Sequence, residues 1–159
     1  MPLDELYKDI ILDHYEYPRN KRHVEGDSCT CAAGNNPACG DTVDVCLTLN
    51  DEHIEDIAFE GRGCAISLAS ASMLTETLEG QTVGAAERWY RTVHGMLTKN
   101  PDEMDTSLEL GDLEALEGVQ QYPARIKCAL LAWEAFHVAL EQTAQPERTP
   151  RQHDAITTE

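Results

Sequence analysis

Lysine is scarce in this chain: among its 159 residues the only four are Lys8, Lys21, Lys99 and Lys127. Lysine and arginine together number 12 against 29 aspartates and glutamates, which gives a net charge of −17. Because so acidic a surface repels phosphate backbones, the composition argues against nucleic-acid binding. No apolar run approaches the length of a bilayer span, and the first six residues have neither the basic nor the apolar region of a secretory signal.

We therefore expect a cytoplasmic protein without a membrane segment, and this expectation decides how its six cysteines are interpreted. In a reducing compartment, cysteines in this number are better explained by metal binding or catalysis than by disulfides. The sequence contains no Cys-x-x-Cys pair, so spacing alone gives only moderate support for a metal site.

The hydrophobic pattern divides the chain into a helix, a group of strands and a run of further helices. Apolar residues at helical spacing predict a first helix that ends before Pro18. Apolar and polar residues then alternate, which predicts a hairpin with its turn at residues 50–53 and a third antiparallel strand ahead of it. After Gly63 the spacing is helical. This order predicts an α+β domain over residues 1–144, followed by a polar tail, residues 145–159, that we expect to be disordered.

Three cysteines and one aspartate lie at boundaries between these predicted elements. Cys39 and Asp41 lie in a turn that leads into a strand, while Cys64 opens a helix and Cys128 lies early in the last helix. At a helix start, unpaired N–H groups and the helix dipole favour the thiolate, which binds metal and attacks sulfur. Three thiolates and a carboxylate suit tetrahedral zinc. Three unrelated buried cysteines are the simpler alternative, and the residues alone indicate a zinc or iron–sulfur site of open function.

Three segments contain a cysteine motif: residues 36–41 (NPACGD), 61–72 (GRGCAISLASAS) and 123–128 (PARIKC). Together with an N-terminal motif at residues 7–20, they resemble the NifU/IscU/SufU family of iron–sulfur cluster assembly proteins. They follow one another in the family's order, so the resemblance extends over most of the chain. It implies an α+β fold in which a small three-stranded antiparallel sheet packs against a layer of helices.

Two features resemble the SufU branch of this family more than the IscU-type scaffolds. An insertion at about residues 99–111 lengthens the interval between the second and third cysteines, and Lys127 stands where IscU-type proteins have a histidine. A protonated lysine has no lone pair for a metal. Proteins of the SufU branch are zinc-dependent sulfurtransferases, which accept persulfide sulfur from a SufS-type cysteine desulfurase and relay it to downstream SUF cluster-assembly proteins.

The resemblance implies a zinc ion held by four residues, namely Cys39, Asp41, Cys64 and Cys128. It also makes Cys39 the persulfide acceptor, freed when a desulfurase histidine takes its place on zinc, with Arg125 pairing with Asp41 or with the docked desulfurase. Two alternatives stay open: a scaffold that assembles a transient iron–sulfur cluster on the same cysteines, and a purely structural zinc domain.

The remaining candidates carry weaker signals. Cys29 and Cys31 would face the same side of a strand, as a second metal site or a redox pair, but two half-buried strand cysteines are the simpler interpretation. Cys46, between valine and leucine, is expected in the core. His14 is expected to be a packing or surface residue, and Asp112 is expected to cap a short helical turn.

Overall fold

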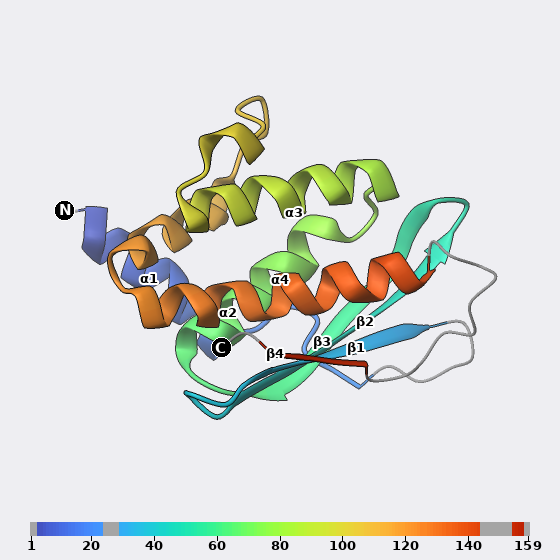
Figure 1. Ribbon diagram of the computed structural model, residues 1–159, viewed down its shortest axis with the longest axis horizontal. Helices are drawn as coiled ribbons and strands as arrows, with labels where there is room; N and C mark the ends of the chain where they lie inside the picture. Colours follow the sequence, from blue (N-terminus) through green and yellow to red (C-terminus); the bar gives the residue numbers. More distant parts are fainter. Residues whose placement is uncertain (1–2, 24–28, 144–153, 158–159) are drawn as a thin grey trace.

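A computed structural model describes residues 3–23, 29–143 and 154–157, in which a layer of helices covers one face of a sheet (Figure 1). The predicted α+β fold class is confirmed. None of the described helices combines the length and the apolarity needed to cross a membrane. In chain order the elements are α1 (Leu3–Glu16), β1 (Thr30–Asn36), β2 (Asp41–Asn50), β3 (His53–Arg62), α2 (Ala65–Leu78), α3 (Val83–Thr98), the 3-10 helices η1 (Pro101–Glu103) and η2 (Gly111–Gln121), α4 (Pro123–Thr143) and β4 (Asp154–Thr157).

The sheet is built on the three antiparallel strands that the sequence predicts. Its strand order is β3-β2-β1-β4, and β2 pairs antiparallel with β1 on one side and with β3 on the other. The predicted hairpin turn joins β2 to β3, with Asp51 and Glu52 at φ of 49° and 65°. Two successive positive φ values match the right-handed twist of a hairpin. At its other end, β2 begins directly after the turn that carries Cys39.

The C-terminal tail contributes a short fourth strand that the sequence does not predict. Strand β4 pairs parallel with β1, from Ala32 opposite Asp154 to Asn35 opposite Thr157. Without it, β1 would be an edge strand with unpaired N–H and C=O groups, which accept any extended segment that reaches them. The expected disorder is therefore wrong for these four residues, and residues 144–153 and 158–159 of the tail lie outside the described part of the chain.

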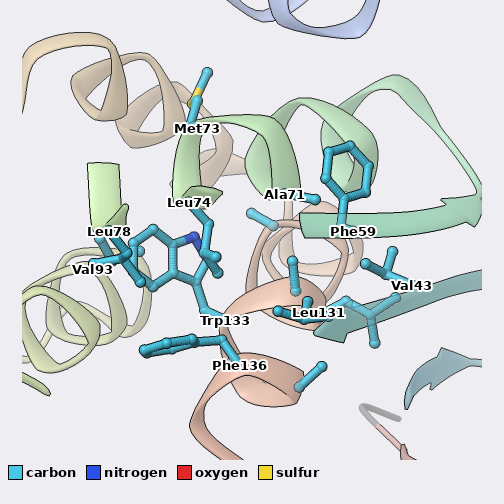
Figure 2. Packing of buried hydrophobic residues seen from close by; sticks show 14 of the residues in the cluster. Val43, Phe59, Ala71, Met73, Leu74, Leu78, Val93, Leu131, Trp133 and Phe136 are labelled. Carbon is cyan, nitrogen blue, oxygen red and sulfur yellow. The ribbon is translucent and has the colours of Figure 1, made fainter. Parts of the chain in front are cut away.

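The hydrophobic core centres on Trp133 of α4, which is fully buried (Figure 2). Leu74 of α2, Val93 of α3 and Phe136 of α4 lie around its ring, and they are fully buried too. The indole N–H donates to Ser70 Oγ at 3.1 Å, so its polar atom is satisfied inside the core. Since truncating a buried tryptophan to alanine costs about 3–5 kcal/mol, this residue does much to fix α4 against α2 and α3.

A buried hydrogen-bonded chain ties α1 to α2 and η2. Ser72 Oγ accepts the Arg19 backbone N–H at 2.9 Å and lies 2.8 Å from His14 Nδ1, which leaves the hydroxyl proton to donate to the imidazole. His14 Nε2 then donates to the Asp112 carboxylate at 2.8 Å. Asp112 is thus the acceptor for a fully buried histidine, and η2 has no side-chain cap. The capping role expected for Asp112 is wrong because Asp112 lies inside the first turn of η2, whose N-cap position is Leu110.

A disulfide links Cys31 of β1 to Cys46 of β2. The two residues face each other in the antiparallel register, so strand pairing itself places both sulfurs on one face of the sheet. That face is the one without helices, because the flanking Ala32 and Val45 point into the main core. The preference for metal binding or catalysis over disulfides is therefore wrong for this pair. Cys46 is buried, as expected, but in a cluster separate from the main core.

Candidate metal centre

Three segments that are far apart in the sequence meet at one end of the sheet. The β1–β2 turn carries Cys39 and leads into β2 at Asp41, the β3–α2 junction carries Cys64, and the second turn of α4 carries Cys128. Helix α4 packs across β1 and β2, which brings its first turns over the β1–β2 turn (Figure 1).

The β1–β2 turn exposes one cysteine and buries the aspartate that follows it. The backbone N–H groups of Cys39 and Gly40 both donate to the Asn36 carbonyl, at 3.1 and 2.8 Å. Gly40 has a φ of 76°, a conformation that glycine adopts without steric cost. Cys39 is consequently exposed at the tip of the turn, whereas Asp41 is 2% exposed at the start of β2.

All four residues of the predicted ligand set lie close together. The sulfur of Cys39 is 3.5 Å from that of Cys128, and the potential ligand atoms of Cys39, Asp41 and Cys128 all lie within 4.8 Å of one another. The Cys64 sulfur lies 3.5 Å from Asp41 Oδ2, but it is not part of that group. Three of the four therefore form a group that could hold a metal ion, and Cys64 lies at its edge.

Hydrogen bonds hold the Asp41 carboxylate in one orientation. The Cys64 backbone N–H donates to Oδ1 at 3.0 Å, and the Ser67 hydroxyl donates to Oδ2. Burial is the largest single influence on Asp41 and opposes ionisation, but these hydrogen bonds, with weaker ones from the neighbouring thiols, outweigh it. The pKa of the Asp41 carboxyl is therefore lowered, and the group is a preformed anion of the kind that could bind a metal ion.

Cys128 is fully buried, and its environment opposes the thiolate. Burial raises the pKa of the Cys128 thiol far above its usual value, and the hydrogen bond with Cys39 and the charge of Cys64 raise it further. Asn36 Nδ2 points toward this sulfur at 4.0 Å, while Asn36 Oδ1 has no hydrogen-bond partner among the residues that the structure describes. A donor aimed at the sulfur suits the deprotonated form, which a bound cation would stabilise.

Arg125 lies on the exposed side of the centre. Negative charge on the sulfurs of Cys64 and then Cys128 raises the pKa of its guanidinium. Its electrostatic partners are thus the two cysteines, whereas the sequence suggested Asp41 or a docked protein. Lys127 is exposed.

Two residues at this centre were not singled out from the sequence. Ser67 orients Asp41, and Gly63 gives the carboxylate its space, since a Cβ at position 63 would lie 2.6 Å from Asp41 Oδ1. The signal for Ser67 was available, because it follows Cys64 by three residues and so shares its helix face. The contact of Gly63 with Asp41 depends on the meeting of two strands, which local spacing does not reveal.

The fold, with three cysteines and an aspartate converging at one end of the sheet, defines a NifU-like N-terminal domain. The family model of that description matches residues 6–142, and the chain belongs to this family. The family predicted from the cysteine motifs is thereby confirmed.

Individual members of this family and related solved structures are similar to the chain over most of its length. The chain is 46% identical to "Zinc-dependent sulfurtransferase SufU" of Bacillus subtilis (strain 168), over 84% of this chain and 88% of the relative. It is 36% identical to "Iron-sulfur cluster assembly scaffold protein IscU" of Streptococcus pyogenes serotype M1, over 95% and 92% of the two chains. Among solved structures it resembles a protein described as an iron–sulfur cluster assembly scaffold for the SUF system from Fervidobacterium islandicum AW-1, with a TM-score of 0.77 and 31% identity, covering 86% of this chain and 97% of that one.

Proposed function

We propose that this protein serves iron–sulfur cluster assembly by accepting persulfide sulfur from a cysteine desulfurase on Cys39 and relaying it to downstream assembly proteins. One observation carries the proposal: the exposed Cys39 sulfur lies 3.5 Å from the buried Cys128 sulfur, above a buried carboxylate. An exposed thiol is thereby held beside a buried thiol and a buried carboxylate. The 46% identity to a zinc-dependent sulfurtransferase supports the same function, and a cytoplasmic location belongs to this proposal.

The donor set suits zinc. Three thiols and one carboxylate provide the sulfur-rich, four-donor environment that tetrahedral zinc prefers. The buried Cys128 thiol, whose pKa is raised without a cation, needs a positive charge beside it to become a thiolate. Cys39, Asp41, Cys64 and Cys128 would hold the ion, which would keep the thiols deprotonated and shielded from oxidation.

The residues of the chain account for the transfer of sulfur. The Cys39 thiolate attacks the outer sulfur of a persulfide on the desulfurase cysteine. A new S–S bond forms on Cys39 as the old S–S bond breaks, and the desulfurase cysteine leaves as a thiolate that takes up a proton. No net oxidation occurs. Arg125, next to Cys64 and Cys128, places a cation near the sulfurs while negative charge moves between them.

A desulfurase assay tests this proposal. Cysteine turnover is measured with the desulfurase alone and with added wild type, Cys39→Ala or Asp41→Ala protein, and Gly84→Ala serves as a matched surface control because a Cβ there contacts nothing. We expect strong stimulation by wild type and Gly84→Ala, and none by Cys39→Ala. Mass spectrometry should find one added sulfur on Cys39. Equal stimulation by a folded Cys39→Ala variant would refute the acceptor role.

The alternative is a scaffold function on the same residues. The 36% identity to a protein named as an IscU scaffold, over 92% of its length, supports this alternative. It predicts iron and sulfide in the purified protein, with a brown colour, where the sulfurtransferase is colourless and carries one zinc. A structural zinc domain predicts that Cys39→Ala unfolds the chain, which far-UV circular dichroism would detect.

A further inference from the structure

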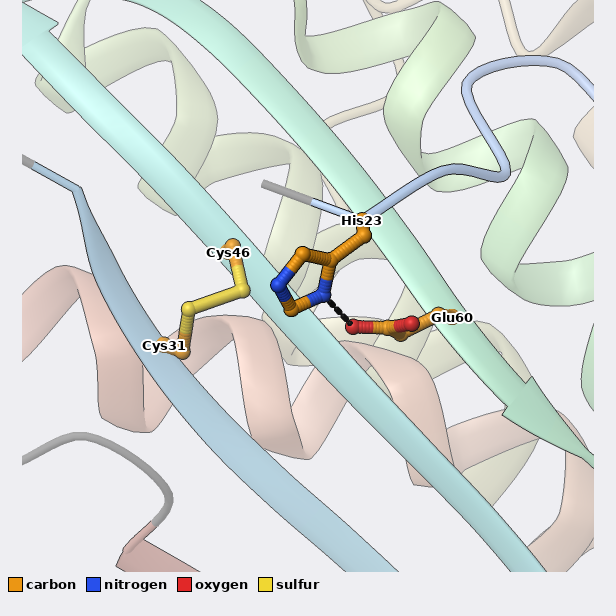
Figure 3. The surroundings of a disulfide bond; sticks show 4 residues. All are labelled: His23, Cys31, Cys46 and Glu60. Carbon is orange, nitrogen blue, oxygen red and sulfur yellow. Dashed lines mark hydrogen bonds and ion pairs between the residues drawn. A yellow bond between two sulfur atoms is a disulfide. The ribbon is translucent and has the colours of Figure 1, made fainter. Parts of the chain in front are cut away.

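Three cysteines lie together on the face of the sheet that the helices leave uncovered. Cys31 and Cys46 form the disulfide between β1 and β2, and Cys29 precedes β1 by one residue. The three are 7% exposed or less, and they make a buried cluster separate from the main core. None of them belongs to the candidate metal centre. Figure 3 shows the disulfide bridging the two strands, with the His23–Glu60 ion pair on the same face.

We propose that this cluster is a thiol–disulfide exchange site that reacts with dithiols, with Cys29 as the exchanging thiol. A disulfide whose only role is to link two strands needs two cysteines. Here a third is buried against the pair, two residues from Cys31 and thus on the same side of an extended chain. Thiol–disulfide exchange requires such contact between a thiol and a disulfide.

The exchange within the cluster is balanced without any outside reagent. The Cys29 thiolate attacks one sulfur of the disulfide, a new S–S bond forms as the old one breaks, and the released sulfur takes up the proton that Cys29 gave up. A dithiol carries out the net reduction: its first thiolate forms a mixed disulfide, and its second displaces the protein sulfur. The dithiol is oxidised to a disulfide, and Cys31 and Cys46 gain two electrons and two protons.

The backbone allows Cys29 to reach a new partner. The ladder between β1 and β2 begins at Thr30 opposite Leu47, so Cys29 lies outside it. Cys46, by contrast, is held in register by β1 and by β3. Because a disulfide requires Cα atoms within about 7 Å, a Cys29–Cys46 bond would draw Cys29, which lies outside the ladder, toward Cys46. The helices pack on the other face, so exposing these buried sulfurs to a dithiol does not require the main core to open (Figure 1).

Disulfide mapping of the full-length protein tests the proposal. Wild type, Cys31→Ser and the Cys29→Ser/Cys31→Ser double variant are equilibrated in reduced and oxidised dithiothreitol at graded ratios. They are then quenched in acid, alkylated and analysed by tandem mass spectrometry. We expect wild type to pass in one two-electron step from a linked Cys31–Cys46 pair to two alkylated cysteines. In Cys31→Ser we expect Cys29 and Cys46 to form a disulfide in the oxidised buffers. Both cysteines should therefore escape alkylation at the same buffer ratios.

The controls separate exchange from a static staple. In the double variant Cys46 should be alkylated at every ratio, and circular dichroism should show that all three proteins are folded. Alkylation of both Cys29 and Cys46 in folded Cys31→Ser at every ratio would overturn the proposal, and so would wild type without a Cys31–Cys46 link in any oxidised buffer. Since mapping identifies each cysteine, exchange at the metal centre cannot be mistaken for exchange here, and the desulfurase assay is independent of this result.

Discussion

Replacing Gly63 with alanine directs a methyl group at the Asp41 carboxylate. The added Cβ would lie 2.6 Å from Oδ1 and 2.7 Å from Cγ, whereas ordinary contacts begin at 3.4 Å. The carboxylate or the backbone at position 63 must therefore move by about 0.8 Å. The carboxylate cannot turn aside freely, because Ser67 and the Cys64 backbone hold its two oxygens.

A displacement of this size matters to a metal ligand. Zinc–oxygen bonds are about 2.0–2.2 Å long and tolerate about 0.2 Å of error. We expect Gly63→Ala to fold and to bind zinc on the order of 10–100-fold more weakly, the range found when the support of a ligand is lost. Competition of zinc with a chromogenic chelator measures this change.

Gly84→Ala provides the control, since the same substitution at an exposed position of α3 meets no atom. There alanine should leave zinc affinity unchanged, and it should stabilise the first turn by at most the value of about 0.5–1 kcal/mol found in helix interiors. If the two variants bind zinc equally well, Asp41 is not a ligand and the inferred four-residue set is wrong.

Three further predictions follow from the structure. The Cys31–Cys46 disulfide closes a 15-residue interval, so the Cys31→Ser/Cys46→Ser variant should lose about 3 kcal/mol of stability and about 6–12 °C of melting temperature; an unchanged calorimetric midpoint would contradict this. Ser67→Ala should raise the lowered pKa of Asp41. The stability that this carboxyl contributes is present above its unfolded-state pKa and lost as pH falls through the folded one, so acid unfolding followed by circular dichroism should begin at higher pH than in wild type. Burial raises the pKa of Tyr90 above 10.0, so its contribution is lost as pH rises beyond that value; Tyr90→Phe should resist alkaline unfolding better than wild type, and identical alkaline midpoints would argue against it.

Much of the fold could be predicted because it follows from local patterns. Alternation gave β2 and β3, the turn at residues 50–53 has the two positive φ values of a tight hairpin, and Thr82 accepts the Ala85 N–H as the cap of α3. Strand β4 could not be predicted this way. Its four residues become a strand because β1 offers an unpaired edge, and an edge exists only after the sheet has formed.

The same distinction applies to the side chains. The motifs drew attention to Cys39, Cys64 and Cys128 because each lies where an element begins or ends, and the structure brings them together. Cys46 gave no comparable signal, since its disulfide depends on which residue of β1 lies opposite. His14 is likewise a member of a buried hydrogen-bonded chain only because α1, α2 and η2 meet around it. That Cys39, Asp41, Cys64 and Cys128 bind metal stays a prediction.

Differences in burial favour Cys39 over Asp41 and Cys128 as the residue that reacts. Asp41 and Cys128 are 2% and 0% exposed, so removing either from a cation would leave a charge or a polar group inside the protein, at considerable cost. Cys39 is exposed at the tip of its turn, so its sulfur exchanges one polar environment for another when it leaves. We infer that Asp41 and Cys128 would retain a bound cation while Cys39 meets the persulfide. Exchanging the roles would require the chain to expose Asp41 at the start of β2 or Cys128 in the second turn of α4, and both residues are buried.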